Sequence, residues 1–233
     1  MKVKILQIIN ESPRVKRFIL APLSGEFDAF LAGQFVVLEN ENWEYPNKNR
    51  SYSISSVINN PRELELCVAL NEKGVFTPWL FSLIVGDVLE CSQPQGKFIL
   101  KEDEQSLKLP HLFIATGTGI APFLSMINEV LKKSQNKVYL VYGNRFEQDI
   151  LYKTYFEMLS VENEKFNFLP ILSREYKPNI AEGYVHASYK IILESIEDAR
   201  IYVCGWKEMC ADTRNELKAM GFNRRQYFFE QYD

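Results

Sequence analysis

The sequence has few of the residues that hold metals or form disulfide bonds. Its 233 residues include four cysteines and two histidines. No two cysteines form a Cys-x-x-Cys pair, so a zinc site or an iron–sulfur cluster lacks ligands and no metal is expected. A disulfide framework is not expected in a chain this long and this poor in cysteine. His111 and His186 are the two histidines, which is too few to suggest a Ser-His-Asp triad.

Long apolar runs and an excess of positive charge are also absent. No segment is apolar enough over its length to span a bilayer, and residues 1–18 carry too many charges for a secretory signal. The net charge of -3 argues against a general nucleic-acid binder. We therefore expect a cytoplasmic protein without membrane insertion and without a nucleic-acid partner.

The first half of the chain is predicted to be all-β. Hydrophobic residues make up 46% of the sequence, enough for a buried core. Short apolar runs recur up to about residue 100, separated by turn signals such as "NEKG" and "QPQG". This pattern indicates a barrel or sandwich of short strands, with one short helix at residues 77–84.

From about residue 110 the pattern changes to an alternation of strands and helices. Four strands are predicted, at residues 111–116, 137–143, 166–173 and 200–205, each followed by a helix. Such an alternation is typical of a parallel, doubly wound sheet. The predicted fold is therefore a β domain followed by an α/β domain, spanning residues 1–103 and 104–233.

The ends of the four predicted parallel strands carry glycines, small hydroxyls or arginines. Ligands of open α/β sheets bind beyond the carboxyl ends of the strands, and these residue types suit a phosphate-bearing ligand. "TGTGIAP" has Pro122 at the start of a helix but lacks a third glycine, so by itself it also fits a plain turn. The candidate binding residues are Thr116, Gly117, Thr118, Gly119, Asn144, Arg145, Ser173, Arg174 and Gly205.

Ser173 and Arg174 lie where the ribose of an adenine nucleotide is expected. A hydroxyl and a guanidinium together can clamp a 2′-phosphate, which predicts NADP(H) as the nucleotide. The alternative for Arg174, and equally for Arg145, is a solvated surface arginine.

The first half contains a polar strand, "RSYS", that does not fit a plain apolar core. Arg50 suits a pyrophosphate, Tyr52 can stack on a flat ring, and Ser53 can hydrogen-bond a ring nitrogen. Further along, "KGVFT" offers a second anion-binding turn. The alternative is a polar strand edge with a surface tyrosine. The candidate residues are Arg50, Ser51, Tyr52, Ser53, Gly74, Val75, Phe76 and Thr77.

Six motifs along the chain together resemble the ferredoxin–NADP reductase family. "RSYS", "KGVFT", "GTGIAP", "SRE", "CGWKEM" and "FFEQYD" follow that family's order and approximate spacing over nearly the whole chain, most like its compact bacterial ferredoxin/flavodoxin–NADP reductases. The resemblance implies a six-stranded antiparallel FAD-binding barrel followed by an NADP(H)-binding domain. It also implies hydride transfer from NADPH to flavin N5, and then single-electron exchange with a ferredoxin or flavodoxin.

The resemblance assigns roles to residues of the barrel. Arg50 would bind the FAD pyrophosphate together with residues 74–77, Tyr52 would lie against the flavin, and Ser53 would lie near N5. Cys67 and Val68 would line the isoalloxazine, and Thr116 would touch the flavin from the second domain.

The resemblance also assigns roles near the C-terminus. Tyr232 would stack on the flavin and move for nicotinamide, while Cys204 and Glu230 would assist the transfer. The family's terminal aromatic motif is followed here by an additional Asp233. Tyr184 stands where bacterial relatives often carry a second arginine. Either Lys177 or His186 compensates for that arginine, or Tyr184 stacks on adenine. NADPH is favoured through Ser173 and Arg174, and NADH stays open as the nucleotide.

The sequence leaves several candidates for the electron acceptor. An acidic ferredoxin or flavodoxin needs a basic docking face, for which the candidates are Arg14, Lys16, Arg17, Arg224 and Arg225. Free flavin, a cytochrome or an oxygenase partner are alternative acceptors. Two non-enzymatic alternatives are a flavin-free scaffold protein and a nucleotide sensor that uses only the second half.

Overall fold

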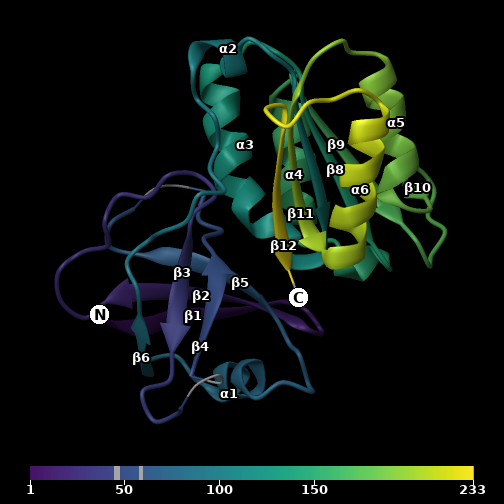
Figure 1. The fold of residues 1–233 in the computed structure, drawn as a ribbon. Helices are drawn as coiled ribbons and strands as arrows, with labels where there is room; N and C mark the ends of the chain where they lie inside the picture. The colour runs from purple at the N-terminus through teal and green to yellow at the C-terminus, as the bar shows by residue number, and fades with distance from the viewer. Residues whose placement is uncertain (45–47, 58–59, 233) are drawn as a thin grey trace. The chain divides into compact units, whose positions relative to one another are not determined.

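The computed structural model describes residues 1–44, 48–57 and 60–232. The chain divides into two compact units (Figure 1). The first comprises Met1–Leu100 with Ala121–Met126, and the second comprises Lys101–Ile120 with the residues from Ile127 onward. Each unit is built on its own six-stranded sheet.

The first sheet is antiparallel throughout and closes into a barrel. Its strands lie in the order β4-β3-β6-β1-β2-β5. The outer strands β4 and β5 are joined where Ile54 bridges Leu66 and the Ser55 N–H donates to the Glu65 carbonyl at 2.8 Å. Closure leaves no long open edge, and the predicted six-stranded antiparallel barrel is confirmed. The strands are β1 Lys2–Ser12, β2 Val15–Pro22, β3 Phe35–Glu39, β4 Asn49–Ser53, β5 Leu64–Ala69 and β6 Val88–Cys91.

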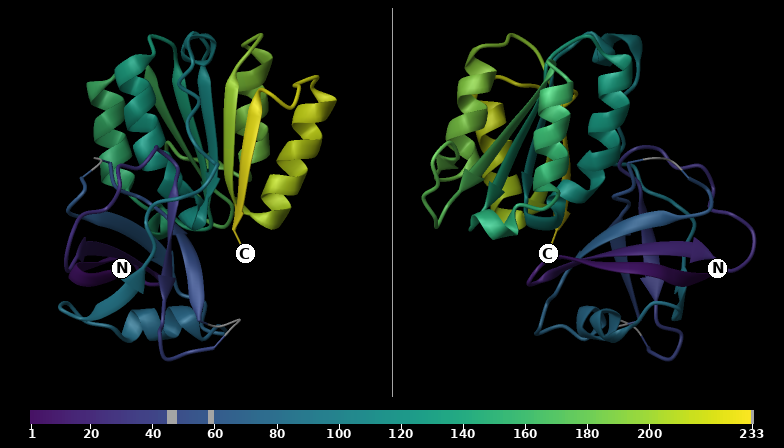
Figure 2. Two further views of the ribbon diagram at one scale, coloured as in Figure 1. Left: turned by 60° about the vertical axis from the view of Figure 1, so that its left-hand side comes forward. Right: turned by 180° about the vertical axis from the view of Figure 1, so that it is seen from behind.

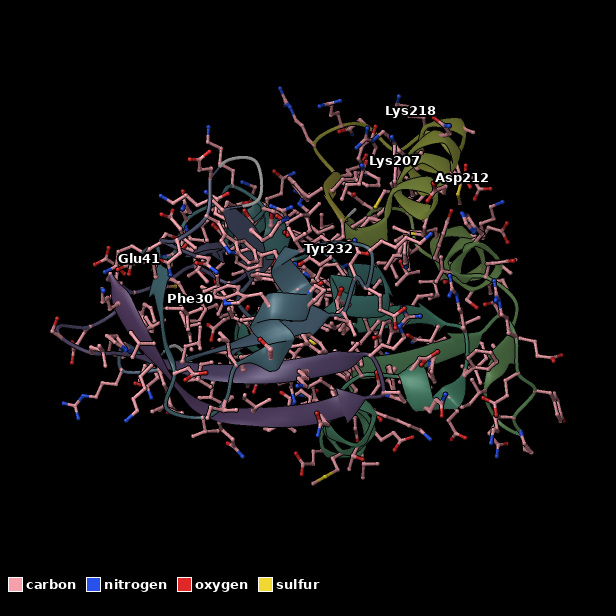
Figure 3. All side chains as sticks on the ribbon, turned by 90° about the horizontal axis from the view of Figure 1, so that it is seen from below. Phe30, Glu41, Lys207, Asp212, Lys218 and Tyr232 are labelled. Atoms are coloured by element: carbon pink, nitrogen blue, oxygen red, sulfur yellow. The ribbon has the colours of Figure 1, made fainter. Side chains whose placement is uncertain are left out.

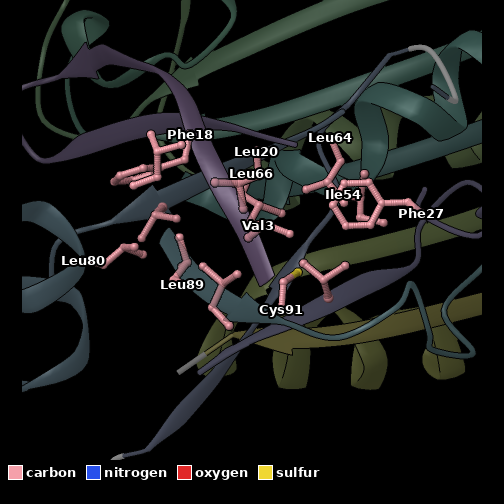
Figure 4. Close-up of a cluster of buried hydrophobic side chains, with 14 of the residues drawn as sticks. Val3, Phe18, Leu20, Phe27, Ile54, Leu64, Leu66, Leu80, Leu89 and Cys91 are labelled. Atoms are coloured by element: carbon pink, nitrogen blue, oxygen red, sulfur yellow. The ribbon is translucent and has the colours of Figure 1, made fainter. Parts of the chain in front are cut away.

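Alternating apolar side chains fill the barrel. In β3, Val36 and Leu38 point inward and are fully buried while their neighbours are partly exposed, as a strand with one buried face requires. Phe18, Leu20 and Leu66 join them in one cluster (Figure 4). The short helix α1, Phe76–Ser82, adds Phe76 and Leu80 to this cluster. Burial of one such side chain stabilises the fold by about 2 kcal/mol.

The second sheet is parallel and lies in the order β10-β9-β8-β7-β11-β12. Its strands are β7 His111–Thr116, β8 Val138–Asn144, β9 Phe166–Leu172, β10 Ala181–Glu182, β11 Arg200–Trp206 and β12 Tyr227–Tyr232. The helices are α2 Glu104–Leu107, α3 Ala121–Lys133, α4 Lys153–Glu162, α5 Val185–Glu194 and α6 Lys207–Ala219, with 3₁₀ turns η1 Gly117–Ile120 and η2 Glu147–Asp149. The predicted parallel α/β domain is confirmed.

Helices cover both faces of this sheet (Figure 2). In β9, Phe168 packs against Phe156 of α4, with ring centroids 5.4 Å apart. Ile171 of the same strand belongs to the opposite cluster, together with Tyr189 of α5 and Leu217 of α6. Side chains of a strand alternate between faces, so this arrangement explains why the parallel strands are apolar on both sides.

Several elements differ from the sequence prediction. The short elements α2 and β10 were not predicted, and neither was the edge strand β12, Tyr227–Tyr232, which pairs in parallel with β11. The sequence pattern indicates a helix over residues 148–162, but α4 begins at Lys153, because Tyr152 adopts a left-handed conformation (φ 54°) that a right-handed helix does not contain. Among the described residues, no helix is both long enough and apolar enough to cross a membrane.

Candidate functional site

The barrel brings Arg50, Tyr52 and Phe76 together, although they come from two distant motifs. The Arg50 guanidinium lies 5.9 Å from the centre of the Phe76 ring, and the Tyr52 ring centre lies 6.3 Å from the same ring. Arg50 is exposed, with its Nη1 donating to the Asn49 carbonyl at 2.6 Å. The strand "RSYS" and the turn "KGVFT" therefore form one surface.

The hydroxyl of Tyr52 is buried and has no hydrogen-bond partner among the described residues. Burial raises the pKa of this phenol above its usual range, and the nearby Arg50 charge only partly opposes that shift. A buried hydroxyl without a partner costs about 1–3 kcal/mol. A bound polar group would remove that cost, so the site fits a ligand with hydrogen-bonding atoms, such as FAD.

Two tryptophans that sequence reasoning missed lie beside this surface. The Trp79 ring of α1 packs edge-on against Phe76 at 5.0 Å, and Trp43 packs against Trp79 at 5.5 Å. The aromatic cluster of Trp43, Tyr52, Phe76 and Trp79 comes from three separate segments. Phe76 and Trp79 are three residues apart, a spacing that brings side chains together on a helix, so the sequence did contain a signal for this one contact. Nothing in the sequence links Trp43 to α1.

The turn at residues 71–77 is held by its own hydrogen bonds. The Thr77 hydroxyl accepts from the Asn71 N–H at 2.9 Å and donates to the Asn71 carbonyl at 3.2 Å. The Gly74 N–H donates to the same carbonyl at 3.0 Å. This turn is therefore preformed, with Val75 exposed and Phe76 buried below it.

The remaining candidates of the barrel lie on two strands. Ser53 is buried at the end of β4 and Ser51 is exposed. Cys67 and Val68 are buried in β5, opposite Arg17 and Lys16 of β2.

In the second unit, strand register brings the predicted strand ends to one edge of the sheet. Thr116 pairs with Gly143, and Cys204 lies opposite both Ala115 and Glu230. Figure 3 looks toward this edge and labels Tyr232, which pairs with Trp206. All the predicted loop residues therefore gather where ligands of parallel sheets bind.

Glycines at this edge allow strands and loops to pack closely. A Cβ at Gly119 would lie 2.3 Å from the carbonyl oxygen of Cys204. Gly205 has φ +144°, and a Cβ there would lie 2.1 Å from Thr116 Oγ1. The Thr116 hydroxyl in turn accepts from the Trp206 N–H at 3.1 Å. These two glycines serve backbone packing at the edge, which fixes the loop at residues 116–119.

The loops that follow β8 and β9 are tied together through their backbones. The Ser173 N–H donates to the Asn144 carbonyl at 3.0 Å, and the Arg174 N–H donates to the Arg145 carbonyl at 3.1 Å. Asn144 Nδ2 is buried without a partner among the described residues. Arg145 and Arg174 are both exposed. An unpaired amide donor in a loop pair that also carries two exposed arginines fits an anionic, hydrogen-bonding ligand such as a nucleotide.

The buried thiol of Cys204 faces the C-terminal strand. Complete burial raises its pKa far above the usual range, the Glu230 charge raises it further, and a hydrogen bond with Tyr232 lowers it. The three residues predicted to act together are thus neighbours within this unit. Burial also raises the pKa of Cys210 to about 11, so both thiols are held protonated and unreactive at neutral pH.

The residues proposed to compensate for the missing second arginine differ in their surroundings. Lys177 is bound to Glu147 at 2.9 Å and to Glu175 at 3.2 Å. His186 packs near Tyr189, with ring centres 5.6 Å apart. Tyr184, at the start of α5, is 73% exposed. Only Tyr184 presents a largely exposed ring to a ligand. Asp233 lies outside the described residues.

Two of the basic residues considered for a docking face are neutralised within the barrel. Arg14 pairs with Glu72 at 3.3 Å, and Arg17 pairs with Glu11 at 2.7 Å and Glu65 at 3.2 Å. Their charge is therefore largely satisfied internally.

The other three basic residues fall into two groups. The Lys16 ammonium donates to the Phe81 carbonyl at 3.0 Å and lies 4.8 Å from the Phe81 ring. Arg224 and Arg225 are exposed and form no ion pair with any described residue.

No three His, Cys, Asp or Glu side chains within residues 1–44, 48–57 and 60–232 are grouped so that they could hold a metal ion.

Two family models cover most of the chain. Residues 2–100 match the oxidoreductase FAD-binding domain, and residues 113–215 match the oxidoreductase NAD-binding domain. The barrel surface and the strand-end loops at residues 116–119, 143–145, 173–174 and 204–206 fall inside these ranges, so the chain has an FAD-binding and an NAD(P)-binding domain.

Individual proteins extend this likeness over the full length. Ferredoxin–NADP reductase B of Sorangium cellulosum is 29% identical, with 100% of this chain and 97% of that protein covered. The electron transfer component of toluate 1,2-dioxygenase from Pseudomonas putida is 26% identical, over 88% of this chain and 59% of that protein. The crystal structure of the Amycolatopsis cytochrome P450 reductase GcoB superimposes with a TM-score of 0.89 at 26% identity, covering 99% of this chain and 69% of that one.

The antiparallel barrel, the parallel nucleotide-binding sheet and both family models agree along the chain. The chain therefore belongs to the ferredoxin–NADP reductase family of FAD- and NAD(P)-binding oxidoreductases.

Proposed function

We propose that this protein is an FAD-dependent NADPH reductase that serves a ferredoxin or flavodoxin. The supporting observation is the combination, in one chain, of the Arg50–Tyr52–Phe76 surface on a barrel with a parallel-sheet edge that carries Arg145 and Arg174. The full-length similarity to a ferredoxin–NADP reductase supports the same function. When bound, the flavin would accept a hydride from NADPH at N5 and pass on single electrons.

The residues of the barrel would bind and orient the flavin. Arg50 would pair with the pyrophosphate beside the preformed turn at residues 74–77. The Tyr52 hydroxyl would gain the hydrogen-bond partner that it lacks, and its ring would lie along the cofactor. Ser53 would hydrogen-bond at N5, and Cys67 and Val68 would line the ring system. Thr116 would contact the flavin from the second domain.

The strand ends of the second unit would bind the nucleotide. The loop Thr116–Gly119 and Gly205 would shape the edge, Asn144 would donate its unused amide hydrogen, and Tyr184 would stack on adenine. Ser173 and Arg174 would hold a 2′-phosphate, which favours NADPH over NADH. The Cys204 thiol, which burial keeps protonated, would border the nicotinamide.

The C-terminal strand would control access to the ring. Tyr232 would cover the flavin until nicotinamide enters, and Glu230 would hold a proton near the reacting atoms. We place the functional boundary between the two domains at residues 103 and 104.

A ferredoxin or flavodoxin would need basic residues to dock on. The ion pairs of Arg14 and Arg17 remove part of the basic surface expected on the barrel, whereas Arg224 and Arg225 supply an exposed basic pair on the second unit. The similarity to an oxygenase electron transfer component favours an oxygenase partner as the second candidate. Steady-state reduction of ferredoxin, flavodoxin, free flavin and cytochrome c by the same preparation compares these acceptors directly.

Retention of flavin tests the barrel site. Arg50→Ala should weaken FAD binding by roughly 10- to 100-fold, because a charge-assisted hydrogen bond contributes about 1.5–3 kcal/mol. Arg62→Ala is the matched control, since Arg62 is an exposed barrel arginine that pairs with Glu26 at 3.5 Å. Equal FAD affinity in both variants would remove Arg50 from the site.

A further inference from the structure

Two arginines at the edge of the parallel sheet have acidic neighbours and yet are not paired with them. Glu147 lies two residues after Arg145, and Glu175 directly follows Arg174. Neither Arg145 nor Arg174 forms an ion pair with a described residue, although backbone hydrogen bonding sets the two residues side by side at 3.1 Å. Carboxylates this close in sequence would ordinarily compete with a bound phosphate for the guanidinium groups.

Both carboxylates form ion pairs with lysines instead. Lys177 Nζ lies 2.9 Å from Glu147 and 3.2 Å from Glu175, and Lys153 binds the other oxygen of Glu147. The second oxygen of Glu175 accepts the Glu147 N–H at 2.7 Å. Hydrogen bonds from Lys153 and Lys177 lower the pKa of Glu147 below its usual range, so this carboxylate is ionised and held.

Lys153 also pairs with Glu157 at 3.7 Å, so Lys153 and Lys177 together bind the three carboxylates of Glu147, Glu157 and Glu175. None of these carboxylates pairs with Arg145 or Arg174, so the two arginines supply the positive charge of the two loops that no carboxylate offsets. Of the two lysines, only Lys177 contacts both Glu147 and Glu175. Its removal would leave Glu175 without a cationic partner among these residues.

We infer that Lys177 determines nucleotide specificity indirectly: by holding Glu147 and Glu175, it leaves Arg145 and Arg174 available for the 2′-phosphate of an adenine nucleotide. This inference rests on the proposed NADPH function. Lys177 is here a positioning residue, in contrast to the direct phosphate ligand that its place after "SRE" first indicates.

The two roles predict different results for a double variant. If Lys177 acts by holding acids, Lys177→Met weakens phosphate binding because Glu175 is released, and adding Glu175→Gln restores it. The glutamine keeps an oxygen for the Glu147 N–H and removes the charge. If Lys177 touches the phosphate itself, Glu175→Gln changes bisphosphate binding by the same factor with and without Lys177, because loss of a nearby carboxylate charge by itself strengthens anion binding. Glu175→Gln alone is therefore measured beside the double variant, and a larger gain in the Lys177→Met background supports the holding role.

Calorimetric titration of the full chain with adenosine 2′,5′-bisphosphate and with 5′-AMP tests the inference and requires no flavin turnover. Lys177→Met should bind the bisphosphate roughly 2- to 5-fold more weakly, with 5′-AMP nearly unchanged, the size expected for an exposed charge interaction. K177M/E175Q should return to within about twofold of the starting protein. Lys190→Met is the matched control, since Lys190 pairs with Glu216 at 2.7 Å and is similarly exposed.

Each other outcome overturns the inference in a recognisable way. Unchanged bisphosphate binding in Lys177→Met, or an equal loss in Lys190→Met, rejects it and leaves the proposed function standing. A loss that Glu175→Gln does not reverse, or a gain from Glu175→Gln that is equal with and without Lys177, makes Lys177 a direct ligand. If the starting protein binds bisphosphate and 5′-AMP equally, both the NADPH preference and the inference fail. Recovery in the double variant also rules out misfolding as the cause of the loss.

Discussion

At the residue scale, buried polar atoms without partners mark both predicted binding surfaces. The Tyr52 hydroxyl lies in the barrel and Asn144 Nδ2 lies at the parallel-sheet edge. Each lies in a motif predicted to bind a cofactor. Proteins leave few such atoms unsatisfied. His111 Nε2 and His186 Nε2 are also buried without a partner among the described residues, so such an atom suggests a ligand only inside a motif that suits one, as around Tyr52 and Asn144.

Replacing Tyr52 with phenylalanine tests this reading. In protein stripped of flavin, the free energy of unfolding of the variant should equal that of the starting protein or exceed it by up to about 2 kcal/mol, because the variant lacks the unsatisfied hydroxyl. The same variant should bind FAD several-fold more weakly. Tyr142→Phe is the control, since the Tyr142 hydroxyl donates to the Gly117 carbonyl at 2.8 Å, and it should destabilise by about 1–2 kcal/mol. Equal destabilisation of the two variants would contradict the account.

His111 should make stability depend on pH. Its ring is buried in β7, with its centre 6.4 Å from the ring centres of both Phe113 and Tyr202. Its Nδ1 lies 3.0 Å from the Leu109 carbonyl, and burial lowers its pKa to about 4. A lowered histidine pKa means that folding favours the neutral ring. Its contribution is therefore complete above the unfolded value near 6.5 and is lost as the pH falls toward about 4.

Urea unfolding at pH 7.5 and pH 5 measures this effect. Between those pH values, protonation of His111 in the unfolded chain should lower the free energy of unfolding by about 2 kcal/mol. In His111→Phe that part of the loss should vanish, whatever the stability of the variant at pH 7.5. An identical pH dependence in both proteins would show that His111 is protonated, or solvated, in the folded state.

At the element scale, the sequence was most informative where a pattern is local. Alternating apolar residues predicted the barrel strands, and apolar runs ending in glycine or small hydroxyls predicted the parallel strands β7, β8, β9 and β11. The late start of α4 was not predictable, because the left-handed conformation of Tyr152 has no local sequence signal. The pairing of β12 with β11 depends on contacts between distant segments, and no periodicity within six residues indicates it.

The same limit applies to the candidate sites. Arg50 and Tyr52 stood out because polar residues interrupt a strand, and the strand-end loops stood out because topology gathers them. The Trp43–Trp79 contact and the ion pairs of Arg14 and Arg17 depend on tertiary structure. Sequence alone therefore overestimated the free basic charge of the barrel.

Close packing at the parallel-sheet edge gives an element-scale prediction. In Gly119→Ala the added Cβ would lie 2.3 Å from the Cys204 carbonyl oxygen. A backbone atom cannot move away without distorting the strand, so the substitution should lower the free energy of unfolding by about 3 kcal/mol. Gly74→Ala meets only ordinary contacts, at 3.4 Å from the Asn71 carbonyl oxygen, and should stay within about 1 kcal/mol. Neither glycine has a positive φ in the range that disfavours alanine, so the contrast isolates steric contact. Thermal unfolding of both variants measures it, and similar midpoints would contradict the close approach.

At the scale of the whole molecule, the chain joins two units with separate cores and separate ligand chemistry. The barrel offers aromatic rings and an arginine, and the parallel sheet offers amide donors and two arginines. Flavin-free scaffold proteins would have no use for the first surface, and a nucleotide sensor built on the second half would leave the barrel unexplained. The combination is that of an FAD- and NAD(P)-binding oxidoreductase, and it supports the proposed transfer of electrons from a dinucleotide to a flavin.

Anaerobic titration of the purified protein with NADPH and then NADH, followed by absorbance, tests this claim most directly. The account predicts flavin bands at about 380 and 450 nm, roughly one flavin per chain, that bleach with one equivalent of NADPH and poorly with NADH. Equal bleaching by NADH would contradict the assigned role of Ser173 and Arg174. A colourless protein that FAD does not reconstitute would contradict the reductase function itself.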